Sequence, residues 1–379
     1  MSYLLSIVVP TKNRYKYLKH LIKLVDNYDL NELELVIQDN SDDNEEIVEY
    51  LKEFAHNENI KYYYSSDQLS QSGNSDRAIL SSNGEYVCFI GDDDGVTKHI
   101  VDCVRFMKKE NIDVLMNNIV SYHWPDYYSG SPLSYSGLIT YDNYKNNITH
   151  INSKCVLDDI IDKGFINRGK LPLVYHGIVR RRLLDEIYKI GKTFFPGSSP
   201  DIANAVSLAL TIDTFVYMDF PIVISGASKH HGGGIRAMKN RAAKIEDVPY
   251  LPKNAKENWE KNIPRVWTGE TVWCESAIKA LRYMNREELI KKVNFENMYA
   301  HFIAFHFPLR KLAYDLCPNK FKLFFLSSLI IIKRYFRAGI KLIRSKIYGK
   351  VKSENMIGNV QDINTCVDIL HEKVSRFPF

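Results

Sequence analysis

Short apolar runs that end in polar residues alternate with helix-like segments over the first 110 residues, and this alternation constrains the fold most. The run LLSIVVP at residues 4–10 is rich in β-branched side chains, as in a strand covered on both faces. Apolar residues recur at helical spacing over residues 15–25, and a second strand, ELELVIQDN, follows at residues 32–40. Strands alternating with helices in this way predict an α/β fold with a doubly wound, mostly parallel sheet.

The alternation continues to about residue 118. The sequence predicts a helix at residues 44–55, a strand at 61–65, a helix at 76–82, a strand (EYVCFIG) at 85–91, a helix at 97–109 and a strand at 112–118. The periodicity is weaker after this strand. A helix is next predicted to start at Ser199, which can cap it, and Pro200 suits its first position. After this helix we expect a strand at 215–225, a glycine-rich loop at 228–236, and helices over 255–300 with Trp259, Trp267 and Trp273 as packing anchors.

The length and composition predict a folded protein of several units. A chain of 379 residues exceeds the usual size of one domain, and 45% hydrophobic with 25% charged residues argues against global disorder. We expect a nucleotide-binding part at 1–115, an acceptor-binding part at 116–235, a helical extension at 236–300, a basic amphipathic segment at 301–352 and a tail at 353–379.

The cysteines predict a reducing compartment. All six stand apart, with neither a CxxC pair nor the short Cys/His spacing of a zinc site. The first residues, MSYLLSIVVPTKNR, have no basic leader and no small-residue cleavage site, so we expect no export signal and a cytoplasmic location.

Positive charge is concentrated in residues 301–352. This segment holds twelve Lys or Arg residues against one acidic residue, a local charge of +11 in a chain whose net charge is +5. Its apolar run at 323–332 has ten residues, about half of what a membrane span needs. Apolar residues beside dense positive charge favour peripheral contact with an anionic membrane surface. The alternative is a buried helix followed by a solvated basic face.

Four polar segments lie near predicted strand ends, where the ligand crevice of an open parallel sheet is found. The sequence contains neither GxGxxG nor GxxxxGK[ST], so it supports neither a dinucleotide fingerprint nor a P-loop. The segments are Pro10-Thr11-Lys12-Asn13-Arg14, Asp39-Asn40-Ser41, Asn74-Ser75-Asp76-Arg77 and Asp92-Asp93-Asp94.

Three consecutive carboxylates at one strand end repel one another unless a cation is present. Alternate residues of an extended segment face the same side, so Asp92 and Asp94 could act together. One carboxylate would accept a hydrogen bond from a sugar hydroxyl, and the other would bind Mg²⁺ or Mn²⁺ that bridges two phosphates. A solvated acidic turn is the alternative.

The combination of IVVPTKNR, VIQDNSDD, Asn74-x-x-Arg77-Ala78 and GEYVCFIGDDD resembles the donor half of family-2 inverting glycosyltransferases of the GT-A fold. The resemblance is specific over residues 1–110 and weaker to about residue 235. It implies a GT-A sheet followed here by a helical C-terminal extension.

The resemblance also implies roles for single residues. It places Thr11 and Asp39 at the base and ribose, Arg77 at the nucleotide, and a metal at the DxD-like cluster, with Asp94 as the leading ligand. The nucleotide-binding set it suggests is Pro10, Thr11, Asn13, Arg14, Asp39, Asn74, Arg77, Asp92 and Asp93. Alternatively, Thr11 is a turn residue, Asp39 a helix cap, and Arg77 a partner of Asp76 or simply exposed.

An inverting transfer needs one base that takes the proton of the acceptor hydroxyl. By resemblance, Asp201 occupies the place of this base, at the start of a helix on the acceptor side. An Asp in a first helical turn also complements the helix dipole, and Pro200 stands where many relatives carry an acidic residue. Asp158, Asp159 and Asp219 are weaker candidates.

The loop at 228–236 carries two histidines and three glycines. A late-loop histidine completes the metal site in some GT-A enzymes, so His230 and His231 are candidate ligands, and Arg236 a candidate contact for the diphosphate. Two exposed histidines are the alternative.

These observations predict a glycosyltransferase dependent on Mn²⁺ or Mg²⁺ that moves a sugar from a nucleotide sugar, with a UDP sugar favoured, to a glycan or lipid-linked acceptor. It would act at the inner face of the cell membrane, with no nucleic acid as partner. A nucleotidyltransferase or pyrophosphohydrolase is the rival enzyme class, and an inactive membrane-docking scaffold is the rival without catalysis.

Overall fold

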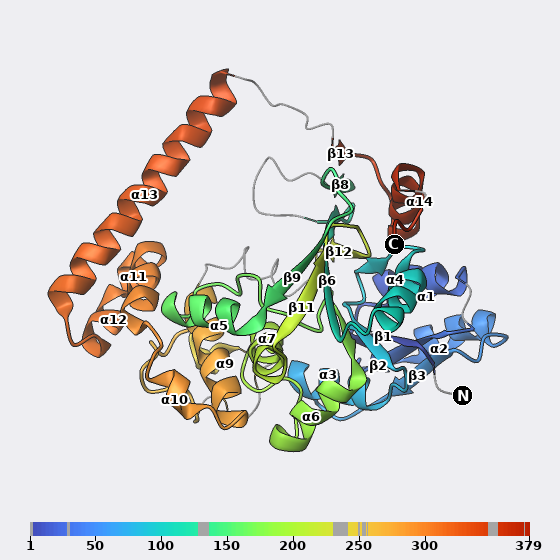
Figure 1. Cartoon of the computed structure of the whole chain (residues 1–379), viewed down its shortest axis with the longest axis horizontal. Helices are drawn as coiled ribbons and strands as arrows, with labels where there is room; N and C mark the ends of the chain where they lie inside the picture. The colour runs from blue at the N-terminus through green and yellow to red at the C-terminus, as the bar shows by residue number, and fades with distance from the viewer. Residues whose placement is uncertain are drawn as a thin grey trace.

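The structure, a computed structural model, places two β-sheets at the centre of the chain with helices around them (Figure 1). It describes residues 3–28, 31–127, 136–229, 242–248, 251, 255, 257–347, 355–374 and 376–379.

The larger sheet carries the predicted parallel strands. Its strands are β1 (Leu5–Thr11), β2 (Leu33–Asp39), β3 (Ile60–Tyr64), β4 (Tyr86–Phe89), β6 (Val114–Asn117), β9 (Ile148–Asn152), β10 (Ile178–Arg180) and β11 (Thr214–Met218). Their order is β3-β2-β1-β4-β10-β6-β11-β9. The first four pair in parallel, as do β6 and β11, whereas β10 and β9 are antiparallel to their neighbours.

The smaller sheet consists of β5 (Gly95–Val96), β7 (Val120–His123), β8 (Leu138–Thr140), β12 (Val223–Ala227) and β13 (Met356–Ile357). Its order is β13-β8-β7-β12-β5. Strand β5 follows the Asp92–Asp94 cluster directly and pairs with β12, so this cluster lies where the two sheets meet.

The helices of the first half are α1 (Tyr15–Asp26), α2 (Glu45–Leu51), α3 (Gln71–Leu80) and α4 (Ile100–Lys109), followed by α5 (Ser153–Asp162), α6 (Arg181–Gly191) and α7 (Pro200–Thr211). The helical C-terminal region has α9 (Gly269–Tyr283), α10 (Glu287–Ile290), α11 (Phe295–Phe305), α12 (Arg310–Leu316), α13 (Lys320–Ile347) and α14 (Ile363–Lys373). Short 3₁₀ turns lie at Lys52–Phe54, Ile245–Asp247 and Phe307–Leu309.

Two apolar cores cover the two faces of the larger sheet. Alternation along β1 sends Val8 into one core with α3, α5, α6, α7 and α9, while Ile7 and Val9 enter the other core with α1 and α4. The sheet is therefore covered by helices on both sides. The predicted α/β class, a mostly parallel sheet flanked by helices and followed by a helical region, is confirmed.

The end of the chain returns to the first half. Helix α14 packs against α1 and β5, and its Ile363 is fully buried in the core that contains Val9. A Cβ atom at Gly95 would lie 2.6 Å from Cγ1 of Ile363, so β5 needs a glycine at this contact. Residues far apart in sequence thus close one core.

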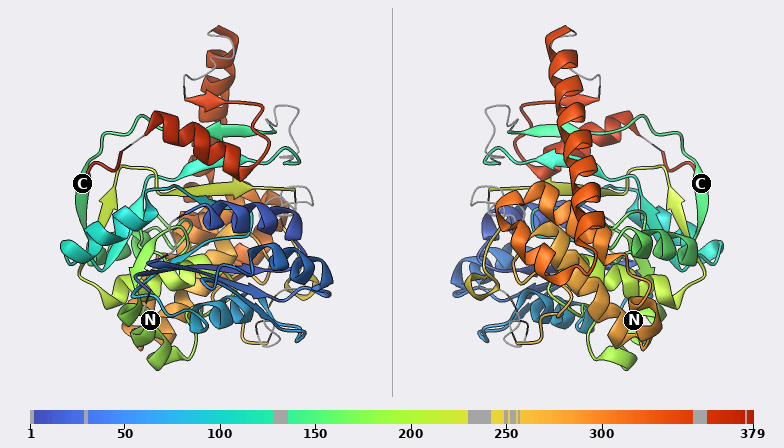
Figure 2. Two further views of the ribbon diagram at one scale, coloured as in Figure 1. Left: turned by 90° about the vertical axis from the view of Figure 1, so that its right-hand side faces the viewer. Right: turned by 90° about the vertical axis from the view of Figure 1, so that its left-hand side faces the viewer.

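Helix α13 extends beyond the rest of the described chain (Figure 2). It carries most of the predicted basic segment. Among the described residues, no helix combines the length and the apolar character that crossing a bilayer requires.

Three local expectations were wrong. The expected strand at 215–225 is interrupted around Asp219 and Pro221, and its halves, β11 and β12, join different sheets. Residues 257–268 are not helical, although Trp259 and Trp267 are buried as anticipated. The third helix begins at Gln71 because Ser70 caps it by accepting a hydrogen bond from the Gly73 amide.

We expect Ile363→Ala to lower the free energy of unfolding by about 3 kcal/mol, because it leaves a cavity between α14 and the core. Urea unfolding measures this change. Thr365→Ala, at an exposed position of the same helix, should change stability by no more than about 0.5 kcal/mol. Equal effects of the two substitutions would contradict the docking of α14.

Candidate functional site

The carboxyl ends of β1, β2 and β4 lie side by side because these strands are parallel neighbours. Thr11 Oγ1 donates a hydrogen bond of 2.6 Å to Oδ2 of Asp92. Ser41 Oγ accepts one of 2.7 Å from the Asn13 amide, and Asn74 Nδ2 donates to the Thr11 carbonyl at 3.2 Å. The structure therefore brings the four predicted segments to one edge of the sheet. Asn74 and Arg77 reach it from helix α3. A helical position was expected for Arg77, whereas Asn74 was expected at a strand end.

Arg14 supplies positive charge to the acidic cluster. Its guanidinium lies 3.1 Å from Oδ1 of Asp92 and 2.5 Å from Oδ2 of Asp93. Burial works against a charged Arg14, but the two carboxylates outweigh burial and raise its pKa. All three aspartates are at most 4% exposed, so the cluster is not the solvated acidic turn considered as the alternative above.

Asp94 joins three segments of the chain. Its Oδ1 accepts a hydrogen bond from the Gly226 amide in β12 at 2.8 Å, and its Oδ2 accepts one from the Gly91 amide at 2.7 Å. Oδ2 also accepts from the Tyr175 hydroxyl at 3.0 Å and lies 2.7 Å from Nε2 of His176. The oxygens of this carboxylate are therefore occupied by protein donors.

The environment of Asp94 lowers its pKa, although burial alone would raise it. The charge and hydrogen bond of His176 act first in favour of the ionised form, and the amides of Gly91 and Gly226 add to them. For Asp92, burial outweighs the opposing charge of Arg14 and raises the pKa to about 7. Neighbouring carboxylates thus differ in their affinity for a proton.

Strand β12 approaches the acidic cluster closely. A Cβ at Gly226 would lie 1.7 Å from the Asp93 carbonyl oxygen, so only glycine fits there. Trp124 Nε1 donates to that carbonyl at 2.8 Å, and Ser228 Oγ donates to Oδ2 of Asp93 at 2.6 Å. The smaller sheet thereby fixes one wall of the site.

Tyr175 and His176 connect this cluster with the start of α7. Their rings are stacked with centroids 3.8 Å apart, and His176 has a φ of 64°, a left-handed conformation that is uncommon for a residue with a side chain. Burial, and then the charges of Asp94 and Asp201, raise the pKa of the Tyr175 hydroxyl. Asp201 itself is exposed in the first turn of α7, near enough for its charge to act on Tyr175.

Asp39 is fully buried and surrounded by hydroxyl groups. Its Oδ2 accepts hydrogen bonds from Tyr15 at 2.6 Å and Tyr62 at 2.7 Å. Its Oδ1 accepts from both the amide and the hydroxyl of Ser41. This carboxylate orders the end of β2 and holds two aromatic rings beside it.

The other predicted nucleotide contacts lie around this edge. Pro10 is half-buried near the end of β1. Arg77 is exposed, and it donates to Ser65 and pairs with Asp67 at 2.9 Å. Asp76, the partner considered for Arg77, accepts hydrogen bonds from the hydroxyl of Thr193 and the amide of Phe194 instead. The binding roles of all these residues stay predictions.

Three buried polar atoms at this edge have no hydrogen-bond partner among the described residues: Oδ1 of Asp92, Oδ1 of Asn74 and Nε of Arg14. Their residues are linked to one another: Asn74 contacts Thr11, and both Thr11 and Arg14 contact Asp92. Unpartnered buried polar atoms are rare, and a cluster of them indicates a place for a polar ligand.

These residues also bear on a divalent metal ion. No group of three or more His, Cys, Asp or Glu residues in the described chain is arranged to hold a metal ion. Mg²⁺, however, is commonly bound through one or two carboxylates together with substrate phosphates. Asp92 Oδ1 fits that mode, whereas Asp94 would have to give up hydrogen bonds. His230, His231 and Arg236 lie outside the described residues.

None of the three weaker candidates for the catalytic base makes a described contact with the acidic cluster. Asp158 and Asp159 are exposed on α5, and Asp159 pairs with Lys163 on the same helix. Asp219 accepts hydrogen bonds from Asn118 and from the Lys145 amide.

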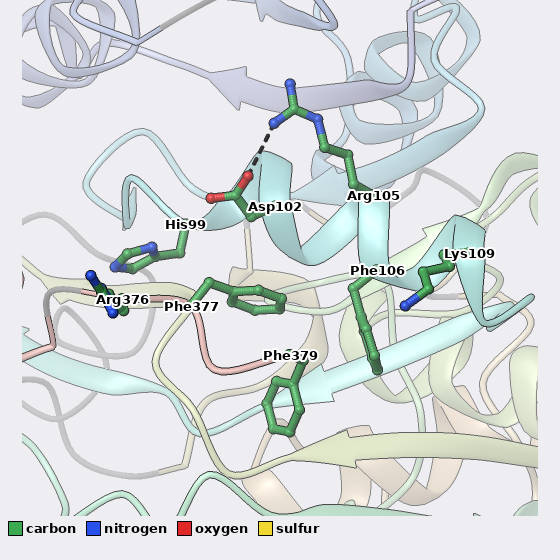
Figure 3. A pocket seen from close by; sticks show the side chains of 8 residues that line it. All are labelled: His99, Asp102, Arg105, Phe106, Lys109, Arg376, Phe377 and Phe379. Atoms are coloured by element: carbon green, nitrogen blue, oxygen red, sulfur yellow. Dashed lines mark hydrogen bonds and ion pairs between the residues drawn. The ribbon is translucent and has the colours of Figure 1, made fainter.

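A pocket of about 490 Å³ lies away from this edge, between α4 and the end of the chain (Figure 3). Its lining residues are His99, Asp102, Arg105, Phe106, Lys109, Arg376, Phe377 and Phe379. None of them belongs to the strand-end segments, so this pocket is separate from the candidate site.

Comparison with known proteins shows what the N-terminal part of the chain is similar to. Residues 6–160 match the sequence profile of Glycosyl transferase family 2. A Campylobacter jejuni protein, GalNAc(5)-diNAcBac-PP-undecaprenol beta-1,3-glucosyltransferase, is 34% identical over 93 residues, which cover 24% of this chain and 29% of that protein. Residues 6–160 are therefore similar to a family-2 glycosyltransferase domain, and the chain spans less than a third of the length of the Campylobacter jejuni relative.

Solved structures of S. aureus TarS are also similar. TarS 1-349 in complex with UDP-GlcNAc has a TM-score of 0.48 at 15% identity, covering 88% of this chain and 92% of that chain. A longer TarS structure has a TM-score of 0.41 at 20% identity, covering 59% of this chain and 37% of that chain.

Sequence reasoning missed Tyr175, His176, Gly226, Ser228 and Trp124. Each reaches the acidic cluster from a segment remote in sequence, and none belongs to a strand-end motif of the first half. The run Tyr175-His176-Gly177 before a strand was the one available signal.

Burial raises the pKa of Asp76 from 3.8 to about 6, against the hydrogen bonds from Thr193 and Phe194. Because this pKa is higher in the folded state than in the unfolded state, the contribution of Asp76 to stability is fully present below about pH 4. That contribution is lost as the pH rises through about 6. Relative to Asp76→Asn, the wild type should lose about 2–3 kcal/mol between pH 4 and pH 7 in urea unfolding. Curves that stay parallel, as we expect for the exposed Asp158→Asn, would refute this.

Proposed function

We propose that this chain transfers a sugar from a nucleotide sugar, most simply a UDP sugar, to a glycan or lipid-linked acceptor with inversion at the anomeric carbon. The observation that carries the proposal is the gathering of four polar segments at one edge of a family-2 glycosyltransferase domain. The name of the Campylobacter jejuni relative gives an undecaprenol-linked glycan as its acceptor, which supports the lipid-linked alternative here.

The donor would bind along the ends of β1 and β2. Asp39 is held in place by Tyr15 and Tyr62, so a nucleoside would meet a preorganised carboxylate with two aromatic rings beside it. Thr11 and Asn74 lie between this carboxylate and the acidic cluster, and Arg77 lies at the rim. This arrangement suits a ligand with a base at one end and phosphates at the other.

The diphosphate would lie beside Asp92 and Arg14. A divalent ion, Mn²⁺ or Mg²⁺, held through Asp92 would offset the negative charge of the diphosphate when bound. Arg14 already neutralises part of the acidic cluster, and its unpartnered Nε is a donor available to an anion. We assign Asp94 to positioning, since its oxygens tie β4, β12 and the Tyr175-His176 segment together.

The proposed reaction is a single displacement. The acceptor oxygen forms a bond to the anomeric carbon while the bond from that carbon to the diphosphate oxygen breaks, and the hydroxyl proton passes to the Asp201 carboxylate. No covalent intermediate on the enzyme is needed. Asp201 is suited to this role because it is exposed to an entering acceptor and still near Tyr175 beside the acidic cluster.

The protein would work at the cytoplasmic face of the cell membrane, with residues 301–352 in contact with anionic lipid. The local charge of +11 and the apolar residues between the basic ones support this contact. A lipid-linked acceptor would then be presented by the same membrane.

Donor binding can be measured by calorimetric titration of UDP, with GDP and CDP as controls. In the presence of Mn²⁺ we expect binding that is lost with EDTA and weakened at least about tenfold in Asp92→Asn, since Asp92 Oδ1 accepts no hydrogen bond from the described residues and has only the ion pair with Arg14. The exposed Asp102→Asn serves as a control. No binding of any nucleotide under any metal condition would reject the donor site and favour the scaffold alternative.

Asp201→Asn should lower the transfer rate by about 10²–10⁴-fold while UDP affinity stays unchanged, because general-base catalysis is lost but the donor site is intact. Asp158→Asn and Asp159→Asn should leave the rate unchanged. The products are to be identified as well. Release of pyrophosphate or nucleoside monophosphate, in place of UDP, would point to the nucleotidyltransferase or pyrophosphohydrolase alternative.

A further inference from the structure

Within the described residues, helix α13 packs on α11 through one of its faces. Leu323 is fully buried and Ser327 is 3% exposed on the side that meets α11. Arg334 holds the same side by donating a hydrogen bond of 2.7 Å to the Ala304 carbonyl, and Lys322 pairs with Glu296 in α11. These contacts fix the orientation of the helix, and hence which residues face outward.

The outward face is aromatic and aliphatic. Phe321, Phe325, Ile332 and Phe336 are 84%, 59%, 64% and 69% exposed. Their spacing of four, seven and four residues puts them on one stripe of an α-helix. Phe324 and Tyr335 widen it, and we call these six residues the aromatic face. Single exposed apolar residues are normal, but a continuous row of this kind marks an interaction surface.

The charge of the helix restricts what can cover this face. Residues 320–347 contain eight Lys or Arg residues and no acidic residue. Lys333 and Arg337 are exposed on the same helix, and within the part of the chain that the structure describes they make no hydrogen bond or ion pair. Two such helices from two copies would repel each other along their length, which disfavours self-association.

An anionic bilayer satisfies both features together. Aromatic and aliphatic side chains enter the boundary between headgroups and acyl chains, and each basic residue near the surface contributes about 1 kcal/mol. A helix anchored on one side by α11 cannot insert across the bilayer, so it must lie along the surface.

We propose that the aromatic face of α13 is a docking site for anionic phospholipid bilayers, with the helix lying in the plane of the interface. This goes beyond membrane contact by residues 301–352 in assigning the contact to one face of one helix. It rests on the proposed function only in its consequence: docking brings the glycosyltransferase domain to a lipid-linked acceptor.

The test is flotation of the full chain with vesicles of phosphatidylcholine alone, or of equal parts phosphatidylcholine and phosphatidylglycerol. The wild type should float with the anionic vesicles, and less so as salt is raised. The triple variant Phe321→Ser, Phe325→Ser, Phe336→Ser should bind at least about tenfold more weakly, because it loses the apolar anchor. These residues are exposed, so we expect the fold to persist, and circular dichroism checks it.

Matched variants separate charge and surface position. Lys333→Glu with Arg337→Glu should abolish the preference for anionic vesicles. Leu80→Ser with Ile190→Ser, two exposed apolar residues on α3 and α6, should float like the wild type. Each variant is also assayed for UDP-sugar turnover with a soluble acceptor, which the α13 substitutions should leave unchanged.

Three results would overturn the proposal. They are a wild type that does not float with either vesicle, a triple variant that floats as well as the wild type, and dimerisation that the triple variant abolishes. If the wild type floats but neither it nor any variant transfers sugar, the docking proposal is supported and the proposed function is rejected. If the wild type transfers sugar to a soluble acceptor but does not float, the proposed function is supported and the docking proposal is rejected.

Discussion

The buried carboxylate of Asp94 is the interaction on which the candidate site depends. It accepts hydrogen bonds from the end of β4, from β12 and from Tyr175, and it lies against His176, so one side chain joins both sheets and the segment before β10. Removing one partner of a buried charged cluster commonly costs about 3–5 kcal/mol, because the remaining groups stay buried and unpaired. The geometry around Asp92, Asp93 and Arg14 therefore follows from a contact that need not touch substrate.

The three adjacent aspartates have different surroundings. Asp94 has its oxygens filled by protein hydrogen-bond donors, whereas Oδ1 of Asp92 accepts no hydrogen bond and has only the ion pair with Arg14, and burial raises the pKa of Asp92 to about 7. Burial disfavours the ionised form of Asp92, so a cation or a hydrogen-bonding ligand beside it would stabilise that form. This assignment shifts the emphasis from Asp94, favoured by the sequence pattern, to Asp92.

The sequence predicts the sheet and half of the site for a clear physical reason. Parallel strands end at the same edge, so polar residues after consecutive strands must meet, and Thr11, Asp39 and Asp92 do. Nothing local marks His176 or Gly226 as partners of Asp94, because their contacts depend on how β10 and β12 close against the sheet. The division of residues 215–225 between two sheets was likewise invisible, since both halves read as one apolar strand. Long-range closure is the part that periodicity does not encode.

The same reasoning explains why α13 is unusual within this chain. Helix α1, by contrast, packs its apolar stripe into the core beside the sheet. Helix α13 has an apolar side in each direction, one against α11 and one outward, with cations between them. A fold under selection for solubility alone would lose six exposed aromatic and aliphatic residues at little cost to packing, because they contact solvent and not the core. Their arrangement in one row, on a helix that also carries exposed Lys333 and Arg337, is what the proposed docking on an apolar and anionic surface requires.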